Sequence, residues 1–399
     1  MARTGVQRAI GFAIALAAAA LAGCPSSSGG GSKGGGADTI RIAVVGPMSG
    51  SGAAFGEMIR KAAELKVSEV NAQGGIGGRK VELVVEDDRG DTTEAANVAR
   101  KLAGDRSISI VIGHFNSTCS NAAKEEYNRK GVVQFSPGST NVSVCAGSPW
   151  TFRNLYRDDY QGTFLAEYAK NVLGAKRVAV IFDNDDYGRG LMEAFRKRAG
   201  EIGLEVLPPI SYVRERTSDF KPVVGQLAGK PIDALFISGL YNEAALITKV
   251  AREELGLTVP ILAGDGVMND KFVEIAGKAA EGVYVTTPFL LDAAKGDPKV
   301  EAFRKAFREK YGKDPDTWAA LTYDAVGMAL EAIRDVGTDR EKIRQWFAAH
   351  TSAGNAYQGV TGPTWFDADG DCYSKGAHVA VVKNGRFVPA ERQYKPQAQ

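Results

Sequence analysis

A run of small polar side chains follows a predicted buried strand near residue 112. The stretch VIGHFNSTCSNAA (111–123) places Asn116, Ser117, Thr118 and Ser120 where this strand gives way to a helix. Hydroxyl and amide side chains can cap such a helix by accepting hydrogen bonds from its first N–H groups. The helix N-terminus can instead bind an anion, because its N–H groups are unpaired and it carries the positive end of the helix dipole. The sequence therefore predicts either a helix cap or an anion site at this turn.

Residues typical of catalytic and metal sites do not form a recognisable pattern. His114, His350 and His378 lack the spacing of metal ligands. The segment 367–378 begins like a calcium-binding loop, but its glycine comes one position early and His378 stands where a glutamate is needed, so we predict a turn. There is no G-x-S-x-G elbow or P-loop, and GGIGG (74–78) precedes a strand, unlike a dinucleotide-binding loop. We expect a protein that is not an enzyme and has no metal and no cofactor.

Strands and helices alternate along the chain after residue 38. The first block has predicted strands at 39–46, 79–88, 107–115 and 132–140, with helices at 56–75, 92–104 and 118–131. The second block has predicted helices at 163–174, 190–203 and 243–256, with strands at 177–188, 233–240 and 259–266. Two such blocks predict an α/β fold of two lobes, each with a parallel sheet flanked by helices. The cleft between the lobes is the expected ligand site.

The last hundred residues depart from this alternation. Long helices are predicted at 297–312 and 317–337, followed by strands and turns at 362–373 and 378–388. The pair Asn384-Gly385 within the last segment is a signal for a β-hairpin.

The N-terminus has the pattern of an export signal. Arg3 and Arg8 precede an apolar stretch that ends in Leu-Ala-Gly-Cys24, which resembles a bacterial lipoprotein cleavage site. We predict a signal peptide over 1–23, lipidation of Cys24 and a flexible Gly/Ser-rich tether over 24–37. The alternative is an ordinary secretory signal with an incidental cysteine. The net charge of +2 shows no basic stripe for nucleic acid, so we expect an exported protein that contacts the membrane only through Cys24.

Three further cysteines would lie in an oxidising compartment. Cys119 and Cys145 each follow a loop at the end of a predicted strand, within one strand-helix-strand unit. We predict a disulfide between them and leave Cys372 as the unpaired thiol. Three separate thiols are the alternative.

An ordered set of segments resembles one known family. IRIAVVGPMSGSGAAFGEMIRKAAELKVSEVNAQGGIGGRKVELVVEDDRGD, IVIGHFNST, VQFSPGSTN, TFRNLYRDDYQG, DNDDYGRG, AGDGV, AEGVYVTTP, TYDAVGMALEAI and GVTGPTWFDADGD follow the order found in branched-chain amino-acid binding proteins of ABC importers. The resemblance covers nearly the whole chain after the tether. It implies the type I periplasmic binding-protein fold, with two Rossmann-like lobes joined by three crossovers that act as a hinge. Lobe one would comprise 38–156 and 287–374, and lobe two 157–286 and 375–399.

The resemblance also assigns the ligand site. A ligand carboxylate would be held by Ser117, with Asn116 beside it, and by the second loop, SPGST, through Gly138, Ser139 and Thr140. Asp265 would accept from the ligand ammonium group. The family often has Tyr where this chain has Leu240, and Tyr241 could substitute after a shift of one residue. The side-chain pocket would comprise Phe55, Phe115, Tyr187 and Trp318. Asp158 and Asp159, in the first crossover, fit hinge or surface roles better than ligand contact.

These expectations combine into a binding function. The protein would capture a small amino acid, most favourably a branched-chain or other apolar one, and the closed, monomeric form would dock on an ABC permease. The closest alternative is the same fold binding an amide, urea or aromatic carboxylate. Another is a sensory ligand-binding module that works with a separate receptor. An enzyme is the remaining class, and no nucleophile-base pair supports it.

Overall fold

The computed structural model describes residues 39–395. The predicted signal peptide (1–23), the predicted lipidation site Cys24 and the predicted tether (24–37) lie outside the described residues. Within 39–395, no helix combines the length and the apolar composition needed to cross a membrane.

Five parallel strands form the first sheet, in the order β2-β1-β3-β4-β5. The strands are β1 (Thr39–Gly46), β2 (Lys80–Asp87), β3 (Ile108–Ile112), β4 (Gln134–Ser136) and β5 (Thr151–Arg153). The central strand β3 is buried along its whole length, as expected for a parallel sheet covered on both faces. Every pairing in this sheet is parallel, which confirms the predicted run of βα units.

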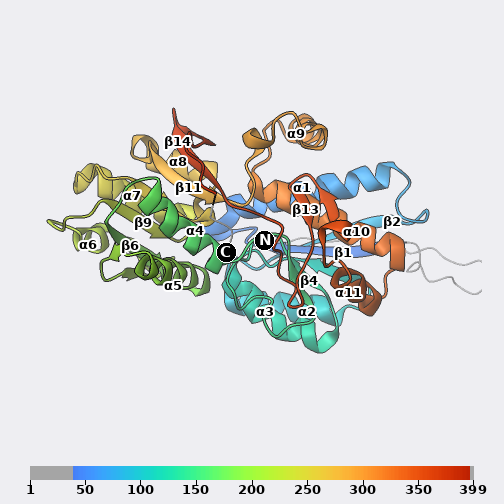
Figure 1. The fold of residues 1–399 in the computed structure, drawn as a ribbon. Helices are drawn as coiled ribbons and strands as arrows, with labels where there is room; N and C mark the ends of the chain where they lie inside the picture. The colour runs from blue at the N-terminus through green and yellow to red at the C-terminus, as the bar shows by residue number, and fades with distance from the viewer. Residues whose placement is uncertain (1–38, 396–399) are drawn as a thin grey trace, which may run out of the picture. The chain divides into compact units, whose positions relative to one another are not determined.

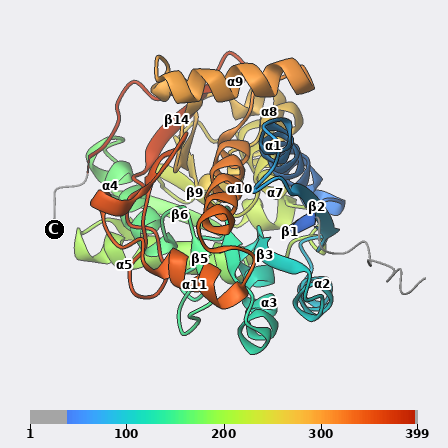
Figure 2. The ribbon, with the colours of Figure 1, turned by 90° about the vertical axis from the view of Figure 1, so that its right-hand side faces the viewer.

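Helices from both ends of the chain cover this first sheet. They are α1 (Ala53–Ala72), α2 (Thr92–Gly104), α3 (Ser117–Lys130), α9 (Pro298–Tyr311), α10 (Thr317–Val336) and α11 (Arg340–Ala348). Several start at an aspartate whose side chain accepts from the first-turn amides, such as Asp91 before α2 and Asp316 before α10. Helices α1 and α10 pack against each other although they are far apart in sequence (Figure 2). Of the long helices predicted in the last hundred residues, α10 therefore packs on the first sheet, and α9 packs on α1.

The second sheet is mixed, with the path β15-β14-β11-β10-β9-β6-β7 and β8 paired to β6. Its strands are β6 (Arg177–Asp183), β7 (Glu205–Val206), β8 (Ile210–Tyr212), β9 (Ala234–Ser238), β10 (Ile261–Ala263), β11 (Val283–Thr287), β14 (His378–Lys383) and β15 (Arg386–Pro389). The pairings from β11 to β7 and to β8 are parallel, whereas β14 is antiparallel to β11 and to β15. The expectation of two parallel sheets is therefore correct for the first sheet and incomplete for the second.

The antiparallel edge follows from the turn that joins its two strands. Asn384 and Gly385, between β14 and β15, have φ values of 55° and 71°. Positive φ at both central residues defines the turn that matches the twist of a two-residue hairpin, and Asn-Gly is its favoured sequence. The hairpin predicted at these residues is confirmed. A smaller hairpin joins β12 (Tyr357–Gly359) and β13 (Gly362–Thr364).

Helices of the middle of the chain pack around the second sheet (Figure 1). They are α4 (Asp158–Asn171), α5 (Asp186–Glu201), α6 (Lys221–Gly225), α7 (Tyr241–Lys249) and α8 (Asp270–Ala276). The described chain also contains the short helices η1 (Gly50–Gly52), η2 (Val250–Glu254), η3 (Asp265–Val267), η4 (Gly277–Ala280), η5 (Leu291–Ala294) and η6 (Ala353–Asn355). Helix α4 begins at Asp158, before the predicted start at 163. This earlier start places Asp158 on a helix instead of in a loop. The boundaries of the two lobes stay a prediction.

The predicted disulfide between Cys119 and Cys145 is wrong in this structure, where both are free and buried, as is Cys372. The two thiols face different surroundings. The Cys145 Sγ lies 3.6 Å from the Gly370 carbonyl oxygen, beside Arg153 and Asp371. Cys119 lies in the first turn of α3, and burial raises its pKa well above the usual value, as does the charge of Asp88. A disulfide would require the two thiol groups to face each other.

Candidate functional site

The opening turn of α3 is left without a side-chain cap. Asn116 occupies the N-cap position, yet its side chain accepts no hydrogen bond from the helix, and its buried Oδ1 has no partner among the residues that the structure describes. The backbone N–H groups of Ser117, Thr118 and Cys119 donate to no other residue within 39–395. The helix therefore presents free donors and a positive dipole end at the carboxyl edge of the first sheet.

The hydroxyl groups of this turn contact other segments instead. Ser117 Oγ accepts from the backbone N–H groups of Thr140 and Asn141, both at 3.2 Å. Thr118 Oγ1 accepts from the Asp186 N–H at 3.3 Å. Ser117 thus joins α3 to the second loop, and Thr118 joins it to an element of the second sheet. These contacts do not support the interpretation of Ser117 and Thr118 as caps of their own helix.

The backbone carbonyl of His114 organises both loops of this part of the site. It accepts from the hydroxyl groups of Ser120 at 3.1 Å, Ser136 at 2.7 Å and Ser139 at 3.2 Å. The imidazole points the other way, into a fully buried contact with Asp88, whose Oδ2 lies 2.7 Å from Nδ1. His114 therefore holds the two loops together and is not exposed for acid-base chemistry.

In the second loop, the lack of a side chain at Gly138 and the hydroxyl group of Thr140 both shape the site. A Cβ atom at Gly138 would collide with the ring of Phe115, so only glycine lets this ring lie against the loop. The Thr140 side chain is buried, and its Oγ1 has no hydrogen-bond partner among the described residues. Ser139 is also buried, but its hydroxyl group hydrogen-bonds within the protein, to the Phe115 carbonyl oxygen at 2.9 Å and to the Ser120 hydroxyl.

Asp265 extends from the second sheet, directly after β10, and is almost fully buried. Its Oδ1 accepts from the Tyr187 hydroxyl at 2.8 Å, and its backbone N–H donates to Gln161 Oε1 at 3.0 Å. The other carboxylate oxygen, Oδ2, has no hydrogen-bond partner within residues 39–395. Burial raises the pKa of Asp265 to about 6, although the Tyr187 and Gln161 hydrogen bonds oppose that rise. Tyr187 therefore orients Asp265, in addition to its expected place in the side-chain pocket.

A second buried carboxylate, Asp158, was not expected here. Asp158 lies at the first position of α4 and is 1% exposed, and neither of its carboxylate oxygens has a hydrogen-bond partner within 39–395. Burial, followed by the charge of Asp265, raises its pKa well above the usual value. Asp159, by contrast, pairs with Arg157 at the surface. Asp158 is thus the acidic residue of the first crossover that faces the site.

Two further polar atoms complete this acidic end. Tyr156 OH and Gln161 Nε2 are buried and have no partner in the described part of the chain. The signal in the sequence was the spacing of Asp158 and Gln161, which puts both on one face once α4 is known to begin at Asp158. The predicted helix began too late for that signal to be used.

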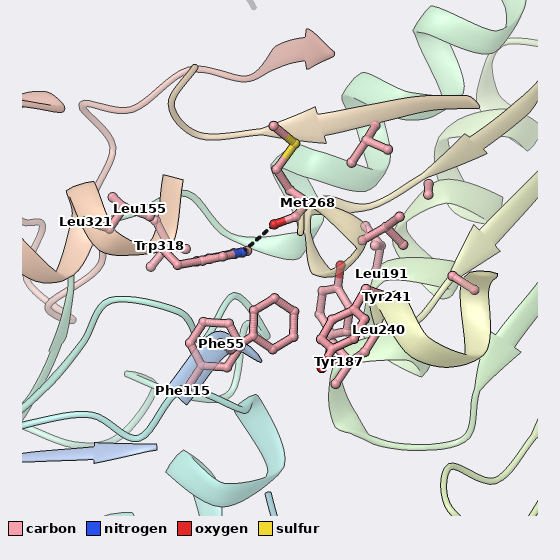
Figure 3. Packing of buried hydrophobic residues seen from close by; sticks show 14 of the residues in the cluster. Phe55, Phe115, Leu155, Tyr187, Leu191, Leu240, Tyr241, Met268, Trp318 and Leu321 are labelled. Carbon is pink, nitrogen blue, oxygen red and sulfur yellow. Dashed lines mark hydrogen bonds between the residues drawn. The ribbon is translucent and has the colours of Figure 1, made fainter. Parts of the chain in front are cut away.

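Aromatic side chains pack against one another between the two polar ends. Phe55 contacts Phe115, Tyr241 and Trp318, with ring centroids 4.6, 4.9 and 5.9 Å apart. Figure 3 shows Phe55, Phe115 and Trp318 on one side and Tyr187, Leu240 and Tyr241 on the other. The expected pocket residues Phe55, Phe115, Tyr187 and Trp318 are therefore gathered in one apolar cluster. The polar atom of Trp318 is used, since its Nε1 donates to Met268 O at 3.0 Å.

Leu240 and Tyr241 have different roles at the start of α7. Leu240 packs against Gly266, where a Cβ atom would meet its Cδ2. The Tyr241 hydroxyl donates to the Ser51 carbonyl, 2.5 Å away, in the first-sheet part of the chain. Tyr241 therefore does not bring its hydroxyl to Asp265, and the suggested one-residue shift is not seen.

The whole arrangement suits binding of a molecule with two opposite charges. One end offers helix N–H groups and Ser117. The other offers the Asp158 and Asp265 carboxyl groups, three of whose oxygens have no hydrogen-bond partner within 39–395, although the charge of Arg153 acts on Asp158. Aromatic rings lie between. Within residues 39–395, no three His, Cys, Asp or Glu side chains are grouped as metal ligands would be. His114 is tied to Asp88 and Tyr127, so it cannot act as a base for a nucleophile at this site.

Comparisons with known proteins agree with this description. A family model described as periplasmic binding protein matches residues 39–386. An amino acid binding protein of Pseudomonas aeruginosa is 33% identical over 342 residues, which are 84% of this chain and 87% of the relative. Leu/Ile/Val-binding protein homolog 2 of Brucella abortus is 33% identical over 83% of this chain and 87% of its own. The branched-chain amino acid transporter substrate binding protein LivJ of Streptococcus pneumoniae, solved in complex with isoleucine, is 33% identical with a TM-score of 0.83, covering 90% of this chain and all of that one.

Proposed function

The chain belongs to the family of periplasmic binding proteins, and from that premise we propose that it captures a small apolar α-amino acid, most favourably a branched-chain one, in the cleft between its two sheets. This is a family of binding proteins and not of enzymes, and it works outside the cytoplasm. The ligand would be delivered to the membrane subunits of an ABC importer. The names of the relatives from Pseudomonas aeruginosa and Brucella abortus support the amino-acid class.

The observation that carries the proposal is the pair of buried carboxylates, Asp158 and Asp265. Three of their four oxygens have no hydrogen-bond partner in the described residues. A buried carboxylate without a cation is costly, since it has lost its hydration and gained nothing in return. The α-ammonium group of an amino acid supplies both a positive charge and three donors for these oxygens. Tyr156 OH and Thr140 Oγ1, also unpartnered, are further polar groups at hand.

The opposite end of the site suits the ligand carboxylate. The free amides of Ser117, Thr118 and Cys119 form a set of donors at a helix N-terminus, where negative charge is favoured. No Lys or Arg is needed there, because the helix dipole and the hydroxyl of Ser117 provide the polarity. An α-amino acid carries its two charges on neighbouring carbons and would join the two ends.

Between the ends, the aromatic rings and Leu240 favour an apolar ligand side chain. Burial of a branched aliphatic group against such rings contributes about 2–3 kcal/mol. Leu240, where the family often has Tyr, adds apolar surface and no donor. A charged ligand side chain would find no partner among Phe55, Phe115 and Trp318.

The competing ligands fit the acidic end poorly. An aromatic carboxylate would bring negative charge, and no ammonium group, to a site with two buried carboxyl groups. An amide or urea has N–H donors but no positive charge to offset Asp158 and Asp265. A sensory module would bind the same amino acid but would pass the signal to a receptor, and nothing in the site favours it over transport.

The proposal also covers the N-terminal anchor, the tether and the contact with the permease. Cys24 would hold a lipid anchor, residues 24–37 would act as the tether, and the protein would work as a monomer that contacts an ABC permease. Metabolic labelling with a fatty acid tests the anchor: label should enter the wild-type protein and be absent from Cys24→Ser.

Three matched compounds test the ligand proposal. Leucine has both charges, 4-methyl-2-oxopentanoate lacks the ammonium group, and 3-methylbutylamine lacks the carboxylate. At about 100 times its Kd, a ligand stabilises the folded protein by roughly 2.7 kcal/mol, which is visible as a rise in melting temperature. We expect the rise with leucine alone. A rise of equal size with the oxo acid would show that Asp158 and Asp265 do not serve an ammonium group, and the proposal would fail.

A further inference from the structure

A close contact joins the two sheets beside the ligand site, where the N-termini of α3 and α5 meet. Asp186 is the first residue of α5, and three residues of the first-sheet part of the chain hold it. Its N–H donates to Thr118 Oγ1, its carboxylate accepts from Asn121 Nδ2 at 2.8 Å, and its carbonyl accepts from Asn141 Nδ2 at 2.5 Å. Each of these hydrogen bonds breaks if the two sheets move apart.

At this contact a side chain at Gly190 would displace the Asn141 amide, which donates to Asp186. A Cβ atom built on Gly190 would collide with Asn141 Nδ2 and would come within 3.8 Å of Asp158 Oδ2. Gly190 does not have a positive φ, so its backbone conformation would accept any residue. Glycine in a helix interior is less favourable than alanine. The reason for glycine here is therefore the approach of α5 to the loop that contains Asn141.

The same turn of α3 serves the ligand and this contact. The amides of Ser117, Thr118 and Cys119 face the proposed carboxylate site, while Thr118 Oγ1 and Asn121 hold Asp186. Two helix N-termini also bring two positive dipole ends together, which is unfavourable unless negative charge lies near them. The Asp186 carboxylate and the ligand carboxylate would both supply that charge. Ligand capture and the approach of α5 are thus coupled through one helix turn.

We propose that Gly190 and Asp186 are positioning residues that set ligand affinity by permitting and holding the approach of α5 to α3, without themselves belonging to the groups that hold the ligand. This inference rests on the proposed function, because it concerns how the same site closes. The contact exists only while the two sheets are close together, so its loss lowers the closed population with and without ligand and thereby weakens binding. A second interlobe contact, between Ser51 and both Glu215 and Tyr241, does not involve Gly190.

A matched pair of glycines tests this on one helix. Gly190→Ala places a methyl group in the contact, whereas Gly200→Ala places it where nothing lies within 4 Å. Both residues are inside α5, and alanine favours a helix, so neither variant should lower the melting temperature of the ligand-free full-length protein. We expect leucine to bind at least tenfold more weakly to Gly190→Ala and within twofold of wild type to Gly200→Ala, as measured by calorimetry.

Two further measurements separate closure from other effects. Small-angle X-ray scattering should give a larger radius of gyration for Gly190→Ala than for Gly200→Ala at saturating leucine. Asn141→Ala removes the atom that the methyl group would meet, so the Gly190→Ala change should cost less affinity in an Asn141→Ala background than alone. Equal affinities for the two glycine variants would overturn the inference.

Binding by the wild-type protein tests the proposed function separately from the role of Gly190. If the wild-type protein binds none of leucine, isoleucine and valine, the proposed ligand class is wrong. The ligand-free radius of gyration then decides the inference: a more extended Gly190→Ala supports it, and identical values for both variants overturn it.

Discussion

Replacing Asp265 by asparagine should make the ligand-free protein more stable while it weakens ligand binding. The Asp265→Asn side chain keeps the shape of the carboxylate and can still accept from the Tyr187 hydroxyl, which now lies 2.8 Å from Oδ1. What it removes is a buried negative charge that has no cation beside it. The two effects have opposite signs, so they cannot both come from a general loss of folding.

The size of the stability change follows from the raised pKa. Burial raises the pKa of Asp265 from 3.8 to about 6, and that difference corresponds to about 3 kcal/mol. Between about pH 4 and pH 6 the folded protein holds a proton that the unfolded chain has released, so the contribution of Asp265 to the free energy of unfolding falls as the pH rises. Above about pH 6 the ionised group is a penalty of about 3 kcal/mol. Hydration of the cleft in an open form would reduce this value, which makes it an upper limit.

Thermal unfolding across pH measures this directly. Asp265→Asn should exceed wild type in melting temperature at pH 7 and match it below about pH 4, in the absence of ligand. Leucine should bind to the variant more weakly by about 2–4 kcal/mol, or roughly 30-fold to 700-fold, because the ammonium group loses an ionic partner. Glu193→Gln, an exposed carboxylate on α5, is the control and should change neither property. A lower melting temperature at pH 7 together with unchanged affinity would refute the role of Asp265.

Three further outcomes are expected. Ser117→Ala should weaken leucine binding at least tenfold, since it removes the acceptor of two loop amides, whereas Thr93→Ala, in the first turn of α2, should not; equal effects would argue against an anion site at α3. His114→Ala should lower the free energy of unfolding by about 3 kcal/mol, because it leaves the Asp88 carboxylate buried without its imidazole partner; an unchanged denaturant midpoint would contradict this. Alkylation of the unreduced, unfolded protein should label all three cysteines of residues 39–395, and a bridged peptide would contradict the free thiols.

The repetitive part of the fold could be predicted because its signals are local. Alternation of apolar residues and the strand-helix order predicted the first sheet, and Asn384-Gly385 predicted the hairpin at the edge of the second. The antiparallel placement of β14 beside β11 could not be predicted, because it pairs residues near 380 with residues near 285. No periodicity within either strand specifies that partner.

Site residues could be predicted where the residue type alone indicates the role. They were missed where the role depends on whether the side chain is buried. A hydroxyl run at a strand end indicates a polar turn in any fold, and the resemblance supplied Asp265. Asp158 and Asp159 are neighbours of the same type, yet one is buried without a partner and the other pairs with Arg157 at the surface. Only the packing of the first turn of α4 distinguishes them. The cysteine pairing failed for the same reason, since the direction of a thiol group depends on tertiary contacts.

The polar turn at 116–120 has more hydroxyl groups than an anion site requires, and their separate contacts explain the excess. Ser120 donates to the His114 carbonyl, and its hydroxyl also lies 2.8 Å from that of Ser139, which fixes the turn to the second loop. Ser117 orients that loop through its amides, and Thr118 reaches Asp186 on the second-sheet side. The backbone amides stay free because these hydroxyl groups are engaged elsewhere. A helix capped by its own side chains would have no free donors for a carboxylate, and Thr118 would not contact Asp186. The lack of a cap therefore allows one turn both to bind the ligand and to contact the second lobe.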